Sequence, residues 1–164
     1  MNAYKILLTV LAGILIHACG PGDQKTSMPE GGGQKMTQSI KEGKGVGEIK
    51  KVELTEPLDE AMIRKGQSIV DMKCAACHKL TDMRVVGPGF EGVTNRRRPE
   101  WIMNMITNVD VMLDEDPVAQ QLLEECLTRM PNQNVSIGDA RDILEFLRKN
   151  DFDRLGKKDE AVNN

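Results

Sequence analysis

The chain has 164 residues, with 22 lysines and arginines against 25 aspartates and glutamates, and its formal net charge is −3. This length suits one small domain, and 40% hydrophobic with 29% charged residues excludes a multi-span membrane protein and a wholly disordered chain. The lack of a basic excess and the 3% aromatic content argue against a nucleic-acid partner, because such proteins neutralise phosphates and stack bases. The four cysteines are too few for a disulfide scaffold.

Residues 1–18 have the pattern of an export signal. Lys5 precedes an apolar run from Ile6 to Ile16, which is too short to span a bilayer as a helix. The run leads to Ala18-Cys19, and this end resembles the lipobox of bacterial lipoproteins. We therefore predict a lipoprotein signal peptide over residues 1–18 and a lipidated Cys19 that anchors the chain to a bacterial membrane on its periplasmic face. The alternative is an ordinary secretory signal with an incidental cysteine.

Residues 19–54 are rich in glycine, lysine, glutamate, glutamine, serine and threonine. Such a composition cannot bury enough apolar surface to offset the entropy lost on ordering the chain. We predict a lipid-anchored flexible tether, of which only the last few residues pack on a folded domain at residues 55–155. Residues 156–164 are predicted to be a disordered polar tail.

The main chemical signal is Cys74-Ala75-Ala76-Cys77-His78. Two thiols at this spacing can add across the two vinyl groups of a haem, and the histidine that follows is then an axial ligand to the iron. A thioredoxin-like redox pair would need a βαβ pattern, which is missing. A zinc site would need a second ligand pair, and only Cys126 remains for one. A Cys74–Cys77 disulfide is a further alternative. We predict one covalently bound haem c.

The sixth iron ligand can be approached by elimination. After signal removal His78 is the only histidine, so a second histidine from this chain is excluded. Lysine prefers to stay protonated, which leaves methionine as the natural partner. The candidates are Met83, Met103, Met105, Met112 and Met130. We favour Met130, because Pro131 resists helix and holds its neighbour in an extended loop, and we keep Met112 as the second choice.

The remaining pattern predicts helices and no strand of any length. Ser136 and Asp139 form a capping-box-like start, and Ile137, Ala140, Ile143, Leu144 and Leu147 follow at helical spacing. Residues 114–117 give a second start signal ahead of another apolar series. We predict an all-α fold.

Residues from about 57 to 150 resemble a class I monohaem cytochrome c. The motifs that carry the resemblance are Cys74–His78, the Gly87-Pro88-Gly89-Phe90 turn, the helix start at Pro99-Glu100-Trp101, and Met130-Pro131. The resemblance implies a small helical domain wrapped around covalently bound haem c, with a first helix over Pro57–Lys73. It also implies that the Pro88 carbonyl accepts a hydrogen bond from His78, and that Gly66 meets Phe146 where the first and last helices cross.

Three further features have two interpretations each. Trp101 either donates its indole N–H towards a haem propionate, as a tryptophan does in some members of the family, or is ordinary helix packing. Arg96-Arg97-Arg98 either neutralises propionates or docks an acidic partner, or it is a solvated loop, which we slightly prefer. Cys126 is expected to be a small buried apolar residue.

These features predict a one-electron carrier, and not an enzyme, in a bacterial periplasmic or respiratory chain. Its partners would be redox proteins, for example a terminal oxidase or a periplasmic nitrogen-oxide reductase as acceptor. The alternative is a haem-based sensor or small-ligand binder, in which Met130 is displaced by CO or NO.

Overall fold

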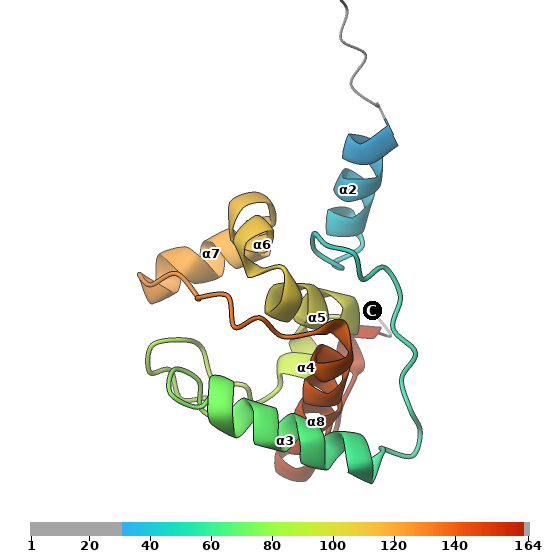
Figure 1. The fold of residues 1–164 in the computed structure, drawn as a ribbon, viewed down its shortest axis with the longest axis vertical. Helices are drawn as coiled ribbons and strands as arrows, with labels where there is room; N and C mark the ends of the chain where they lie inside the picture. Colours follow the sequence, from blue (N-terminus) through green and yellow to red (C-terminus); the bar gives the residue numbers. More distant parts are fainter. Residues whose placement is uncertain (1–30, 163–164) are drawn as a thin grey trace, which may run out of the picture. The chain divides into compact units, whose positions relative to one another are not determined.

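The computed structural model describes residues 31–162, and this part consists of helices and loops (Figure 1). In chain order the helices are α2 (Gly31–Lys41), α3 (Glu60–Lys73), α4 (Val93–Arg96), α5 (Pro99–Thr107), α6 (Val109–Glu115), α7 (Pro117–Cys126), α8 (Ile137–Leu155) and the 3₁₀ helix η1 (Glu160–Val162). The described part contains no strand, only one isolated bridge, so the predicted all-α fold is confirmed. None of these helices has the length and apolarity needed to cross a membrane. The predicted signal peptide and Cys19 lie outside the described residues.

The crossing of α3 and α8 is the most extensive helix contact in this part of the chain (Figure 1). Gly66 of α3 lies directly against α8. A Cβ atom on Gly66 would lie 2.0 Å from the carbonyl oxygen of Asp142 and 2.9 Å from Cβ of Phe146. The expected meeting of Gly66 and Phe146 is therefore confirmed, and the crossing requires glycine because any side chain would push the helices apart.

The helix starts follow from side-chain caps. Asp59 accepts hydrogen bonds from the N–H groups of Ala61 and Met62, so α3 begins at Glu60 and not at Pro57 as expected. At the start of α8, Ser136 accepts from the Asp139 N–H at 3.0 Å, as predicted. Each cap satisfies backbone donors that the first helical turn leaves without partners.

The segment before α3 differs from the expected flexible tether. Residues 31–41 are helical, and residues 42–54, here called the strap, run along α5 and α6 towards α3. Asn104 donates to the carbonyls of Lys44 and Ile49 at 3.0 and 2.9 Å and accepts from the Ile49 N–H at 3.1 Å. The N–H of Val46 donates to the sulfur of Met112 at 3.0 Å. Because Val46 and Ile49 are buried, the strap is part of the folded domain.

The C-terminal segment also differs from the predicted disordered tail. Gly156 ends α8 in a left-handed conformation, and the chain then returns towards α4 and forms η1. Asp159 pairs with the buried Arg148 of α8 at 2.8 Å, and the same guanidinium donates to the Thr55 carbonyl at 3.1 Å. Residues 157–162 are therefore ordered, because α8 provides a charged partner for them.

Candidate haem-binding site

Cys74, Cys77 and His78 lie on a compact turn that continues from the end of α3. Cys74 caps the helix, and the N–H groups of Cys77 and His78 both donate to the Cys74 carbonyl, at 3.1 and 2.9 Å. Both thiols are free and half-buried, so the disulfide alternative is not formed. Burial raises the pKa of the Cys74 thiol. Among the residues that the structure describes, no group of three or more His, Cys, Asp and Glu side chains is arranged to hold a metal ion, which gives the zinc alternative no support.

The imidazole of His78 is fixed in one tautomer. Its Nδ1 atom lies 2.8 Å from the carbonyl oxygen of Pro88, which confirms the expected hydrogen bond. Because a carbonyl can only accept, Nδ1 carries the hydrogen, and the Nε2 lone pair is left for another partner. Burial lowers the pKa of His78 despite the bond to Pro88, so the neutral form that a metal requires is favoured.

Two residues of the following turn lie close to this ring. The Phe90 ring stacks on His78, with the centroids 4.6 Å apart and the planes 9° from parallel. Gly87 is buried, and a Cβ atom there would lie 2.4 Å from Cε1 of His78. The sequence singles out the Gly-Pro-Gly-Phe turn but not the stacking, because ring geometry depends on side-chain angles that the sequence pattern does not specify.

The methionines fall into different environments. Met103 and Met112 are 3% and 0% exposed, and the Met112 sulfur already accepts the N–H of Val46. Met83 is 59% exposed on the loop that follows His78. Met130 is half-buried in the irregular loop between α7 and α8, against the hydrophobic core. Met112 is therefore engaged in core packing, whereas Met83 and Met130 lie in loops, and of these two Met130 is the one that packs against the hydrophobic core.

Trp101 has a different partner from the propionate considered above. Its indole N–H donates to Asp116 Oδ1 at 3.0 Å, and the residue is 6% exposed. Asp116 also accepts the Ala119 N–H at 2.9 Å and so caps α7, which places a helix start where the acidic run predicts one. This corrects the placement of Trp101 among the haem-binding residues, because the indole links α5 to the start of α7.

The three consecutive arginines are not a uniform solvated loop. Arg96 donates to the Glu91 carbonyl at 2.6 Å, and the Arg97 guanidinium lies 5.4 Å from the centroid of the Trp101 ring. Burial, and next the charge of Arg96, lower the pKa of Arg97. Arg98 lies 3.6 Å from the buried carboxylate of Glu100. Each guanidinium therefore has a separate structural contact.

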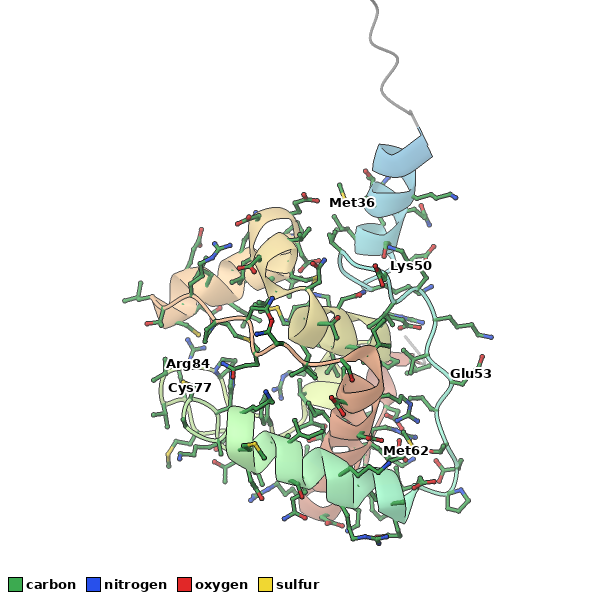
Figure 2. The ribbon with its side chains drawn as sticks, viewed as in Figure 1. Met36, Lys50, Glu53, Met62, Cys77 and Arg84 are labelled. Carbon is green, nitrogen blue, oxygen red and sulfur yellow. The ribbon has the colours of Figure 1, made fainter. Side chains whose placement is uncertain are left out.

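A residue that sequence reasoning missed is Arg84, on the same loop as Cys77 (Figure 2). Its backbone forms a bridge with His78, and its side chain pairs with Glu125 at 2.7 Å. The same guanidinium lies 3.6 Å from the sulfur of Cys126, which is half-buried at the end of α7. Cys126 therefore has a polar neighbour, in contrast to the expected apolar environment. No signal in the sequence pairs residues 84 and 125.

The donor set fits a haem c. Two free thiols on one turn suit thioether formation, and a neutral imidazole with an unused Nε2 suits haem iron. The Pro88 carbonyl accepts the hydrogen bond from the other ring nitrogen, and such a bond usually orients a histidine that ligates a metal.

Comparison with known proteins agrees with this arrangement. The family model of cytochrome c matches residues 63–151. A solved cytochrome c from Rhodothermus marinus is 36% identical, with a TM-score of 0.66 over 71% of this chain and 98% of that chain. An engineered form of the cytochrome c from the same organism is 36% identical with a TM-score of 0.63, over 70% of this chain and 96% of that chain. Another engineered form, described as bound to a carbene intermediate, is 35% identical with a TM-score of 0.61 over the same shares of the two chains. Curated proteins give no significant match.

The chain belongs to the cytochrome c family, because the family model covers more than half of it and the Rhodothermus marinus structure is similar over most of its length. Membership implies covalently bound haem c and haem-based electron transfer. Members of the family are typically electron carriers rather than enzymes, and they usually act outside the cytoplasm.

Proposed function

We propose that this protein carries one electron on a single haem c attached to Cys74 and Cys77, with His78 and Met130 as the axial ligands. We further propose that it acts on the periplasmic side of a bacterial membrane, anchored by lipidated Cys19. The observation that carries the proposal is the hydrogen bond from His78 Nδ1 to Pro88, because it directs Nε2 to a ligand from a turn that also bears two free thiols.

The choice of Met130 rests on what the other methionines do. The sulfur of Met112 is buried and accepts a backbone N–H, and Met103 is in the core, so moving either would disrupt packing. Met130 is in a loop and is followed by Pro131, which keeps this stretch from becoming helical. This combination favours Met130 as the second axial ligand.

The haem, when bound, supplies an iron that cycles between ferric and ferrous states. The protein's own contribution is to fix both ligands and to exclude small molecules from the iron. Met/His ligation raises the potential, and the Pro88 hydrogen bond tunes the donor strength of the imidazole. With His78 and Met130 both bound to it, the haem iron would have no open position for a substrate, which suits electron transfer.

The ligand assignment is tested with three methionine variants. Met130→Ala should lose the methionine–iron charge-transfer absorption of the ferric protein and lower the reduction potential. The exposed Met83→Ala is the matched control and should keep both properties. If Met112→Leu removed the absorption and Met130→Ala did not, Met130 would not be the ligand.

A sensor that binds CO or NO is the alternative, and one observation favours it: the loop that carries Met130 is joined to α6 by an exposed ion pair, between Arg129 and Asp114. Rapid CO binding to the unaltered ferrous protein would support the sensor, whereas slow binding supports the electron carrier.

The location and partners are tested separately. Cys19→Ser should move the protein from the membrane fraction to the soluble periplasmic fraction without changing its absorption spectrum. Retention in the membrane would contradict lipid anchoring. Redox titration against reconstituted terminal oxidases and nitrogen-oxide reductases would identify the acceptor by its rate of reduction.

A further inference from the structure

The loop that carries Met130, residues 127–136, is here called the methionine loop. No backbone–backbone hydrogen bond joins residues 128–135 to another described segment. Leu127 at its start is 89% exposed, and Val135 near its end is buried. Its position between these ends therefore depends on side-chain contacts, among them the packing of Met130 against the core.

Three cationic side chains make contacts in this loop or just before it. Arg84 pairs at 2.7 Å with Glu125, which lies two residues before the loop begins. Lys73 Nζ donates to the Gln133 carbonyl at 3.0 Å. Within the loop itself, Arg129 pairs with Asp114 of α6 at 2.7 Å.

Two of these cationic side chains, Lys73 and Arg84, belong to the chain segment around the haem-attachment motif. Lys73 directly precedes Cys74 at the end of α3, and the Arg84 backbone forms a bridge with His78. Figure 2 shows Arg84 and Cys77 on the same loop after α3. The two contacts therefore join the segment with the haem-attachment motif to one position before Met130, Glu125 at the end of α7, and one after it, Gln133 in the loop.

We propose that Arg84 and Lys73 are positioning residues that hold Met130 in place for ligation, and that this hold weakens as ionic strength rises. The inference rests on the proposed function, because it takes Met130 as an axial ligand. On this proposal, the rate at which Met130 leaves the iron depends on contacts that salt can screen.

The solvent exposure of the Arg84–Glu125 ion pair limits how strongly it can hold Met130. The side chains of Arg84 and Glu125 are each 41% exposed. The hydrogen bond between them raises the pKa of Arg84 and lowers that of Glu125, so both stay charged near neutral pH. Exposed pairs of this kind shift an equilibrium by roughly 1.5- to 5-fold. Screening at about 1 M salt, where the Debye length is about 3 Å, should remove most of that.

The experiment measures the rate at which imidazole replaces methionine in the ferric holoprotein. Imidazole at pH 8 is mostly neutral, so salt acts on the protein rather than on the ligand. The rate in the unaltered protein should rise about 1.5- to 5-fold between low salt and about 1 M salt. Arg84→Gln should have the raised rate already at low salt and a smaller salt dependence, and Lys73→Gln should change in the same direction.

A double-mutant cycle separates positioning from a general loss of stability. Glu125→Gln should match Arg84→Gln, the two together should add little, and the charge swap Arg84→Glu with Glu125→Arg should restore the slow rate. Lys157→Gln removes another exposed ion pair, to Glu160 at 2.7 Å, and serves as the control that should leave the rate unchanged.

The result separates this inference from the proposed function. If Met130→Ala keeps the methionine–iron absorption, the ligand assignment is wrong and this inference is wrong with it. If that absorption depends on Met130 but the Arg84→Gln rate equals that of the unaltered protein at low salt, only the positioning role is overturned. An equal increase in Lys157→Gln would also overturn it.

Discussion

At the scale of single residues, the environment of His78 is defined by the three residues Gly87, Pro88 and Phe90. Pro88 fixes the tautomer, Phe90 covers one face of the ring, and the absence of a side chain on Gly87 leaves room for the imidazole. Each acts on a different property of the ligand: its protonation, its desolvation and its position.

Gly87→Ala tests the close approach. The added Cβ would lie 2.4 Å from Cε1 of His78, so the ring must shift and the bond to Pro88 must lengthen. We expect a loss of about 1–3 kcal/mol in the free energy of unfolding. We also expect a higher reduction potential, because a weaker hydrogen bond makes the imidazole a poorer donor to iron. Urea unfolding and spectroelectrochemistry measure the two effects.

Gly138→Ala is the matched control, because the nearest atom to a Cβ there is 3.8 Å away. It should leave the potential unchanged. An unchanged potential in Gly87→Ala would contradict the role given to this contact.

Whether a residue contact could be predicted from the sequence depends on how far apart its two partners lie along the chain. The His78–Pro88 bond joins two motifs whose partner residues are ten positions apart, and the family resemblance predicts it. The partner of the Trp101 indole could not be predicted, because Asp116 lies on another helix and reaches the ring only after α5, α6 and α7 have packed. Arg84 and Glu125 are 41 residues apart and carry no local pattern that pairs them.

At the scale of the elements, the strap is joined to α5 by the side chain of Asn104. Asn104 is fully buried on α5, and its side-chain amide makes three hydrogen bonds to the backbone of the strap. A polar side chain in the core is costly unless it is satisfied in this way. The strap and Asn104 therefore stabilise each other.

Asn104→Ala should detach the strap. The buried Ile49 N–H loses its acceptor, and an unsatisfied group of this kind costs about 1–3 kcal/mol. Hydrogen exchange at Ile49 should accelerate, while exchange in the middle of α8 changes only with global stability. Asn108→Ala removes a single bond, to the Val46 carbonyl at 3.2 Å, and should have a smaller effect. Unchanged exchange at Ile49 would show that Asn104 does not hold the strap.

The hydrogen bonds of Glu145 on α8 predict how the stability of the fold depends on pH. Glu145 of α8 is buried, which opposes its ionisation, yet hydrogen bonds from Thr55, Arg141, Asp59 and Arg148 lower its pKa below 4.5. Because the folded-state pKa is lower than that of the unfolded chain, this contribution to stability is present above about pH 4.5 and is lost as the pH falls through the lowered value.

Urea unfolding between pH 6 and pH 3 checks this dependence. The unaltered protein should lose stability more steeply over this range than Glu145→Gln, which has no carboxylate to protonate at this position. Parallel pH profiles for the two proteins would contradict the assignment.

Element starts were predictable where a cap lies next to its helix, as at Ser136 and Asp116. The start of α3 was misplaced by three residues because the resemblance gave the helix but not the cap, which is Asp59. The strap was wrongly predicted to be flexible, because its composition is polar and glycine-rich. Its order comes from Asn104 and Met112, which lie 55 and 66 residues further along the chain.

At the scale of the whole molecule, the domain is small and its apolar interior is modest. The crossing of α3 and α8 and the contacts of α5 form the part of the core that protein side chains alone complete. The fold class followed from the sequence, because helical spacing and capping pairs are local and no stretch has strand alternation. The ordered structure of residues 157–162 could not be predicted from the sequence, because it depends on the ion pair between Asp159 and Arg148.

Haem attachment should therefore govern folding. A chain with Cys74→Ala and Cys77→Ala cannot form thioethers, and we expect low accumulation and reduced helicity, because a domain of this size gains little stability from its own core. Circular dichroism and the periplasmic yield measure this. Helicity and yield equal to those of the unaltered protein would show that the helices fold without covalent haem.

The ordered strap limits how far an anchored molecule can travel. If Cys19 is fixed in a bilayer, the covalent path to the packed part of the domain ends within α2, near Met36, which packs against the core, rather than at residue 55. The intervening chain, with residues from 31 onwards helical, cannot exceed about 50 Å, against about 125 Å for a fully extended stretch from 19 to 54. A donor embedded in the same membrane would have to present its redox centre no further from the lipid than this length plus the width of the domain, so the early packing of the chain would favour partners of low height above the lipid.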